Sequence, residues 1–242
     1  VIEDHIWLTH GRLLYGGASP TLPVNPILAA LDPISGQRSV ASSGALSIAR
    51  YDAQGLTLSP VTLALAPQRL AYSPDGSRLW VLDSQGGLSA YLAASGAFER
   101  RLSLQAFTQS QPATLFLLDS LGQVWLDNGP NRRLPVYAAV SGDRLYALDA
   151  DGLSAPSALA ATAGGEVAVA DDATDAIVFF RAADGLPTRV WRDVADGLRL
   201  QRVDGMAFDA SGRALIHDAV SAYLQWADFT GDLIDRRRQI DA

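Results

Sequence analysis

Between residues 73 and 83 the chain reads Ser73-Pro74-Asp75-Gly76-Ser77-Arg78-Leu79-Trp80-Val81-Leu82-Asp83, a polar turn that ends in glycine followed by a short apolar run. A second apolar run, Leu88–Leu92, leads to another turn, Ala94-Ser95-Gly96. Runs of this length suit short strands and are too short for helices. Glycine supplies the positive φ of a hairpin turn, and Asp and Ser bond to the turn backbone. The stretch therefore predicts antiparallel strands joined by tight turns.

The same pair of glycine turns recurs along the chain. The first turn of each pair ends at Gly36, Gly76, Gly122, Gly165 and Gly212, and the second at Gly55, Gly96, Gly142, Gly185 and Gly231. The two glycines of a pair are 19 or 20 residues apart, and the second glycine recurs every 41 to 46 residues. This period matches a four-stranded propeller blade, whereas a β-solenoid would repeat every 20–30 residues. Each unit is predicted to run strand a, glycine turn, strand b, polar loop, strand c, glycine turn, strand d.

A single small sheet cannot bury both of its faces, so repeated sheets must stack or close into a ring. We predict an all-β fold, a β-propeller formed by one domain over residues 1–242. Its five complete four-stranded blades are expected at about 27–66, 67–111, 112–156, 157–202 and 203–242. Residues 1–26 are expected to form a two-stranded partial blade around Gly11 and a connection. Whether the ring has five or six positions stays open, and a sixth would need strands from elsewhere or from a longer chain.

Composition excludes several classes of function. The chain has 242 residues, 48% of them hydrophobic, a net charge of −7 and no cysteine. It can bury a sizeable core, and its charge repels phosphate backbones, so nucleic acid is not an expected partner. No apolar run reaches the length of a membrane helix, so no transmembrane segment is expected. Disulfides, thiolate catalysis and iron–sulfur clusters are excluded.

Two segments resemble known propeller repeats. Residues 70–83 resemble the core of YVTN-type and WD-like repeats, and residues 203–218, Val203-Asp204-Gly205-Met206-Ala207-Phe208-Asp209-Ala210-Ser211-Gly212-Arg213-Ala214-Leu215-Ile216-His217-Asp218, are similar to NHL-type repeats. The resemblance covers residues 27–242 in five copies. It implies a β-propeller, a fold on which many unrelated functions are found. It also implies that the b–c and d–a loops share one rim, where such proteins usually bind ligands or partners.

Four predicted b strands end in an acidic residue: Asp83, Asp127, Asp171 and Asp218. Carboxylates around one opening are candidate ligands for Ca²⁺, which prefers oxygen ligands. The alternative, which we favour because the residue recurs in successive units, is that each Asp caps its own loop. His217 precedes Asp218 and is a candidate general base, with a partly exposed loop histidine as the alternative.

Four further residues are candidate partner contacts. Trp7 and Trp191 fall near expected loop or edge positions, while Trp80 and Trp125 lie inside b strands and are expected to pack between sheets. Asn128 and Asp172 directly follow two of the strand-b carboxylates.

The catalytic motifs G-x-S-x-G and H-E-x-x-H, the Walker loop and G-x-G-x-x-G do not occur in the sequence. We therefore favour a non-enzymatic module that binds another protein or a larger assembly through its loop rim and needs no cofactor. One alternative is a calcium-dependent hydrolase or lactonase, implied by a resemblance to gluconolactonase-like propellers. A second alternative is a binder of small ligands or sugars. The missing initiator Met, the lack of cysteine and the resemblance to often-exported YVTN-type repeats favour an extracytoplasmic bacterial location, periplasmic or secreted.

Overall fold

The structure, a computed structural model, describes residues 7–9, 12–14, 26–42, 44–104, 113, 115–127, 134–148, 153–193, 197–209 and 211–238. For residues 7–9, 12–14 and 26 and for Arg238 it describes the backbone only. All the regular elements of these segments are β-strands. In the described part of the chain, no helix is long and apolar enough to cross a membrane.

The strands form five antiparallel sheets of four consecutive strands each, plus one hairpin. The first sheet contains β3 (Pro26–Leu31), β4 (Arg38–Ser42), β5 (Ser47–Tyr51) and β6 (Thr57–Thr62). The second contains β7 (Pro67–Tyr72), β8 (Arg78–Asp83), β9 (Gly87–Leu92) and β10 (Phe98–Ser103). The third contains β11 (Phe116–Leu118), β12 (Gln123–Leu126), β13 (Leu134–Ala138) and β14 (Arg144–Leu148). The fourth contains β15 (Pro156–Ala161), β16 (Glu166–Asp171), β17 (Ala176–Arg181) and β18 (Pro187–Arg192). The fifth contains β19 (Val203–Phe208), β20 (Ala214–Asp218), β21 (Tyr223–Ala227) and β22 (Leu233–Arg238). The hairpin pairs β1 (Trp7–Thr9) with β2 (Arg12–Leu14).

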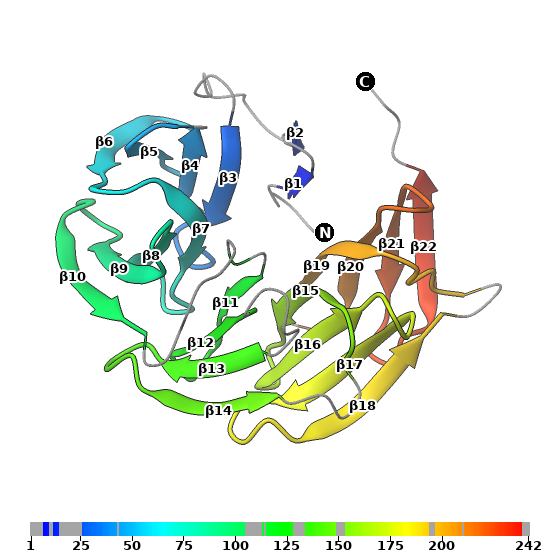
Figure 1. Cartoon of the computed structure of the whole chain (residues 1–242). Helices are drawn as coiled ribbons and strands as arrows, with labels where there is room; N and C mark the ends of the chain where they lie inside the picture. The colour runs from blue at the N-terminus through cyan, green and yellow to red at the C-terminus, as the bar shows by residue number, and fades with distance from the viewer. Residues whose placement is uncertain are drawn as a thin grey trace.

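The sheets are arranged like blades around a common centre (Figure 1). The first strand of each sheet is innermost, because β3, β7, β11, β15 and β19 lie next to one another in that order. The last strand of each sheet lies at the periphery (Figure 1). This arrangement confirms the predicted propeller with five complete four-stranded blades, which are numbered 1 to 5 below. The β1–β2 hairpin lies between blades 1 and 5, where β1 is beside both β3 and β19.

The glycine turns have the predicted backbone conformation. All ten repeat glycines have positive φ, from +67° at Gly76 to +94° at Gly231. L-residues pay a steric cost in this region and glycine does not, so the turns select glycine. The regular spacing in the sequence is therefore a spacing of hairpin turns.

The hydrophobic core lies between blades. Four clusters of buried side chains fill the four junctions between consecutive sheets. The b strands are buried on both faces: in β8, Leu79 and Val81 pack toward blade 1, while Trp80 and Leu82 pack toward blade 3. This double burial explains why the b strands read as continuous apolar runs rather than alternating ones.

Polar contacts also join consecutive blades. A side chain from the third or fourth strand of one blade donates a hydrogen bond to a backbone carbonyl in the c–d turn of the next, and this contact occurs at each of the four junctions. The pairs are Arg50 with Ala93, Arg100 with Ala139, Tyr146 with Ala182 and Arg189 with Phe229. The c–d turn glycines lie at the same junctions: a Cβ at Gly142 would approach the carbonyl oxygen of Ser103 to 2.8 Å. These glycines therefore allow close contact between blades as well as positive φ.

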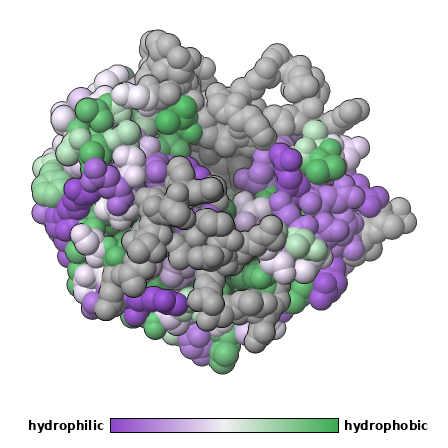
Figure 2. Space-filling model, viewed as in Figure 1, coloured by the Kyte–Doolittle hydropathy of each residue, from purple (hydrophilic) through white to green (hydrophobic). Residues whose placement is uncertain are grey.

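Antiparallel strands place alternate turns at opposite ends of each sheet. The a–b and c–d turns form one rim, named here the turn rim, and the b–c turns and d–a connections form the other, the loop rim. On the loop rim the b–c turn of a blade bonds to the connection before its own first strand, as Ser84 N–H does to Ala66 O at 3.1 Å. On the face seen in Figure 2, hydrophobic and hydrophilic residues are interspersed, and hydrophilic residues gather over the β19–β22 sheet.

Candidate functional site

The four strand-b carboxylates all lie on the loop rim and are buried. Asp171 is typical: its Oδ2 accepts the backbone N–H groups of Ser154 and Ala155, in the connection before β15. Its Oδ1 accepts those of Ala173 and Thr174, in its own b–c turn. Each such carboxylate accepts hydrogen bonds from backbone N–H groups of the turn that would otherwise need water as a partner.

Two other blades repeat this arrangement. Asp218 accepts the N–H of Arg202 on Oδ2 at 3.0 Å and that of Ser221 on Oδ1 at 2.7 Å. Asp127 accepts the N–H of Leu115 at 2.9 Å. These contacts agree with the loop-capping interpretation of the repeated Asp.

The same contacts bear on the calcium interpretation. The carboxylate oxygens that would bind a cation already accept hydrogen bonds within their own blades. Among the described residues, no three His, Asp or Glu side chains are grouped as metal ligands would be. These contacts do not favour the calcium interpretation, and calcium binding and the hydrolase alternative stay predictions.

His217 lies within β20 and is 3% exposed, so the expectation of a partly exposed loop histidine is wrong. Its ring Nδ1 forms a short contact with the Asp204 carboxylate of the neighbouring strand β19. The burial follows from the position of His217 inside β20, all of whose residues are buried. As a candidate general base, His217 is positioned by Asp204 but is covered from solvent.

The candidate partner contacts are placed differently from one another. Trp191 is 5% exposed and packs edge-on against Phe179, with ring centres 4.7 Å apart, in the core between blades 4 and 5. The expectation that Trp191 is an exposed contact is therefore wrong, because the end of β18 is covered by blade 5. Trp7 lies in β1, where only the backbone is described, and Asn128 lies outside the described residues.

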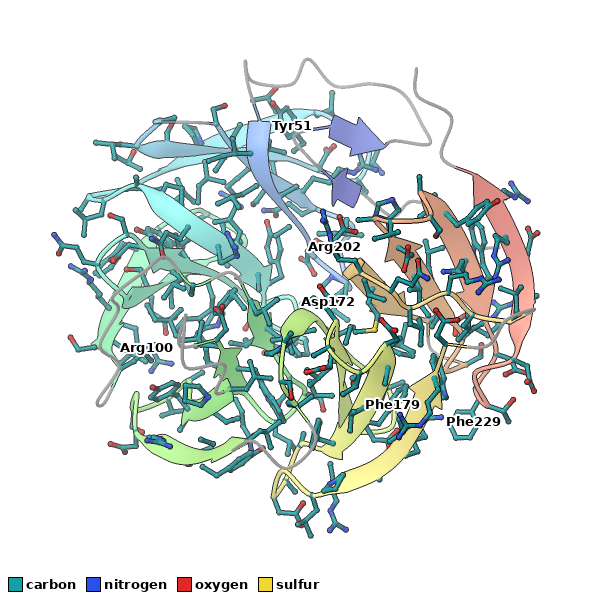
Figure 3. All side chains as sticks on the ribbon, turned by 45° about the vertical axis from the view of Figure 1, so that its right-hand side comes forward. Tyr51, Arg100, Asp172, Phe179, Arg202 and Phe229 are labelled. Carbon is teal, nitrogen blue, oxygen red and sulfur yellow. The ribbon has the colours of Figure 1, made fainter. Side chains whose placement is uncertain are left out.

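Asp172 and Arg202 lie toward the centre of the ring (Figure 3). Burial raises the pKa of Asp172, while a hydrogen bond with Ser157 and the positive charge of Arg202 act in the opposite direction. The Asp172 Oδ1 atom is buried and, in the described part of the chain, has no hydrogen-bond partner. Asp172 is thus a partly buried carboxylate at the inner edge of the loop rim.

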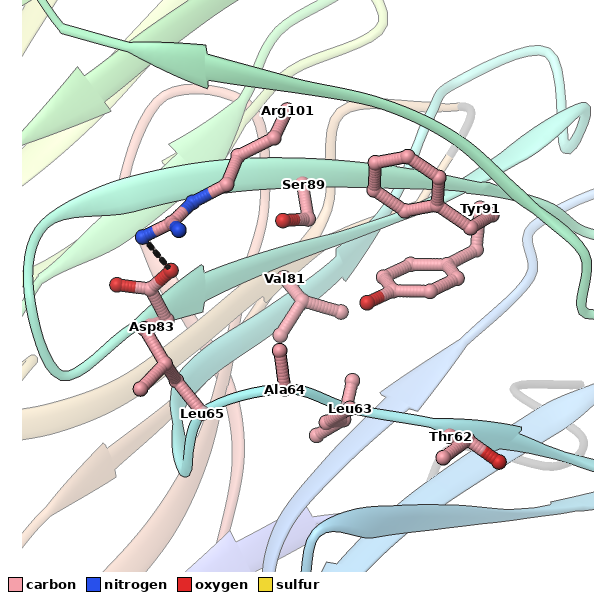
Figure 4. A pocket seen from close by; sticks show the side chains of 10 residues that line it. Thr62, Leu63, Ala64, Leu65, Val81, Asp83, Ser89, Tyr91 and Arg101 are labelled. Atoms are coloured by element: carbon pink, nitrogen blue, oxygen red, sulfur yellow. Dashed lines mark ion pairs between the residues drawn. The ribbon is translucent and has the colours of Figure 1, made fainter.

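The pocket of the candidate site lies between blades 1 and 2 (Figure 4), a feature that the sequence did not indicate. It has a volume of about 290 Å³, near the lower limit for ligand pockets. The connection after β6 forms one wall with Leu63, Ala64 and Leu65, and the face of blade 2 forms the other with Val81 and Tyr91. The walls are therefore mostly apolar.

Aromatic residues line the end of the pocket nearest the turn rim. Phe98 packs edge-on against Tyr91, with ring centres 5.7 Å apart, and is 60% exposed. Burial raises the pKa of the Tyr91 hydroxyl, so this group stays neutral and serves as a hydrogen-bonding group in the pocket.

An ion pair closes the other end of the pocket. Arg101 Nη2 lies 2.7 Å from Asp83 Oδ2, and Figure 4 shows this contact beside Ser89. Asp83 Oδ1 caps the b–c turn by accepting the N–H groups of Gln85 and Gly87. Asp83 thus differs from Asp171 and Asp218, whose second oxygens bind the d–a backbone.

Gly87 makes this ion pair possible. A Cβ at Gly87 would lie 2.4 Å from the Arg101 Nε and Nη2 atoms, so only glycine allows the guanidinium to cross β9 at this point. In the sequence, Gly86-Gly87 after a strand-b Asp is the one signal that could have drawn attention to the pocket.

Comparisons with known proteins agree at the level of the fold. No protein-family model matches the sequence, and no curated protein gives a significant match. Among solved structures, 1505 chains match. One of them, from a crystal structure of a nidogen/laminin complex, has a TM-score of 0.67 and 16% sequence identity, over 89% of this chain and 80% of that chain. At this identity the likeness concerns the fold alone, which agrees with the β-propeller seen in the structure.

Proposed function

We propose that the protein is a non-enzymatic, protein-binding module, and that the pocket between blades 1 and 2 anchors an apolar side chain of its partner. The pocket carries the proposal: its apolar walls are bounded by an exposed Phe98 and by the Asp83–Arg101 ion pair. Aromatic and arginine side chains around a small pocket are typical of the few interface positions that dominate binding energy.

Two further observations support a protein partner. The pocket is formed by a rigid sheet and by one short connection, so it needs little ordering on binding. The structural neighbour described above comes from a complex between proteins.

The pocket wall provides a matched pair of variants for the test. Ala64 and Ala66 are both exposed in the same connection, but only Ala64 lines the pocket. We expect Ala64→Arg to fill the pocket with a long charged side chain, and Ala66→Arg to leave it open.

A library of displayed random peptides is selected on the wild-type protein, and the binders are then titrated against both variants. We expect peptides rich in apolar residues, with affinity at least about tenfold lower for Ala64→Arg and unchanged for Ala66→Arg. A library without binders, or binders that tolerate Ala64→Arg, would contradict the proposal. A glycan array on the wild-type protein tests the sugar-binding alternative directly.

A further inference from the structure

A second groove lies on the turn rim, between blades 2 and 3. It has a volume of about 280 Å³ and is formed by the a–b turns of both blades and the c–d turn of blade 3. Trp80 and Arg100 form its floor, and Leu121 and Val140 flank it. This groove is separate from the pocket at the β6–β7 connection and shares no residue with it.

Arg100 places a positive charge in this groove. Its guanidinium lies over the Trp80 ring, 5.5 Å from the ring centre, and its Nη2 is 3.4 Å from the carbonyl oxygen of Ala139. Its Nε is buried and has no hydrogen-bond partner among the residues that the structure describes. Within the described segments, no carboxylate forms an ion pair with Arg100.

The carboxylates near Arg100 have other direct partners. Arg78 lines the same groove, and both ends of its guanidinium are bound by Glu99, at 2.6 and 3.0 Å. Asp75 also lines the groove, but its carboxylate accepts hydrogen bonds from Ser73 and Ser77 in its own turn. The two carboxylates near these two guanidinium groups, Glu99 and Asp75, therefore have Arg78 and the turn of blade 2 as their direct partners.

The equivalent groove between blades 4 and 5 provides an internal comparison. Arg189 occupies the position of Arg100, four residues after the c–d turn glycine, and packs between the rings of Phe179 and Phe229. Its Nη2 pairs with Glu166, the first residue of its b strand, at 3.1 Å. In blade 2 the first residue of the b strand is Arg78, a residue of the opposite charge. The same fold position thus holds an arginine with a direct ion pair in blade 4 and, among the described residues, an arginine without one in blade 2.

We propose that the groove between blades 2 and 3 binds a carboxylate side chain from an apolar segment of a partner protein, with Arg100 as the residue that pairs with it. A guanidinium donates charge-assisted hydrogen bonds to a carboxylate, and one that lies over an aromatic ring is held in place for this contact. Leu121 and Val140 are 57% and 74% exposed on either side, so apolar neighbours of the acidic residue would bury them.

The test uses an array of hexapeptides in which a Glu is flanked by apolar residues, each printed beside its Gln counterpart. The full chain is applied, and the best pair is titrated by fluorescence anisotropy. We expect the Glu peptide to bind at least about tenfold more tightly than the Gln peptide, because a charge-assisted pair is lost in the latter. Arg100→Gln should remove this preference, while Arg181→Gln, an exposed turn-rim arginine paired with Asp184, should keep it.

A second variant separates binding from folding, because Arg100 also contacts Ala139. Val140→Asp adds a negative charge to the groove at an exposed turn position and should weaken the Glu peptide by at least about tenfold, whereas Val220→Asp on the loop rim should not. Equal binding of Glu and Gln peptides, no binding to the array, or wild-type affinity in both Arg100→Gln and Val140→Asp would overturn the proposal. The Ala64→Arg variant should bind these peptides with wild-type affinity. Failure of the proposal for this groove can therefore be told apart from failure of the proposal for the pocket between blades 1 and 2.

Discussion

In blade 3 the c–d turn glycine, Gly142, should be far less tolerant of substitution than the a–b turn glycine, Gly122. Gly142 and Gly122 have similar φ values, +82° and +71°, so a side chain at either position pays the same backbone cost of about 1–2 kcal/mol. They differ in their surroundings: a Cβ at Gly122 meets no atom within 4 Å, whereas one at Gly142 lies 2.8 Å from the Ser103 carbonyl oxygen of blade 2.

That carbonyl belongs to the backbone of β10, so it cannot turn away as a flexible side chain could. Forcing an extra carbon into a packed junction costs about 1–3 kcal/mol. Gly142→Ala should therefore lower the free energy of unfolding by about 2–5 kcal/mol, and Gly122→Ala by about 1–2 kcal/mol. For a chain of this length, each kcal/mol corresponds to about 2–4 °C in Tm.

Urea denaturation followed by far-UV circular dichroism, together with calorimetric Tm values, measures both variants against the wild type. The informative quantity is the difference between the two variants, since the backbone cost cancels. Equal destabilisation of Gly142→Ala and Gly122→Ala would refute the assignment of the c–d turns as close contacts between blades.

Three other changes test the site. Gly87→Ala should displace the Arg101 guanidinium from Asp83 and weaken peptide binding in the pocket between blades 1 and 2. Because the guanidinium is flexible and can move aside, the free energy of unfolding should change by less than about 1 kcal/mol. Unchanged peptide affinity would argue against a role for the ion pair. Asp172→Asn should raise Tm at pH 7 but not at pH 3. The raised pKa of Asp172 means that its ionised form destabilises the native state, and this effect vanishes once the carboxyl is protonated in both the native and the unfolded state. Thermal melts at the two pH values test this prediction. Asp171→Ala should lower the free energy of unfolding by at least about 2 kcal/mol because buried N–H groups lose their acceptor. The Tm of the wild-type protein should be the same in calcium and in chelator, and a calcium-dependent Tm would support the metal interpretation.

The fold was predictable because its determinants are local. A hairpin turn needs glycine at a fixed position, and each of the ten repeat glycines marks a turn between two strands of a blade. The positions of these glycines therefore predict how the chain divides into strands. The double burial of the b strands is likewise visible as runs of apolar residues without alternation. The second role of Gly142, contact with the preceding blade, depends on the distance between chain segments about 40 residues apart and leaves no mark in its own turn.

The candidate site was harder to predict because it depends on contacts between segments that are far apart in the sequence. Repetition identified the strand-b carboxylates, but only the structure shows that Asp83 pairs with Arg101 while Asp171 binds backbone. Trp191 was misjudged because its position at the end of an outer strand suggests an edge, whereas a neighbouring blade covers it. Differences between repeats, rather than the repeat itself, mark the surfaces for which function is proposed.

The position of the β1–β2 hairpin has a consequence for the order of assembly. Each blade and each junction described here joins segments close in sequence, so these contacts form with little loss of chain entropy. The contact of β1 with β19, in contrast, brings together residues almost 200 positions apart. We expect it to form last and to break first, so hydrogen exchange at the innermost strand of the fifth blade should outpace that at the third.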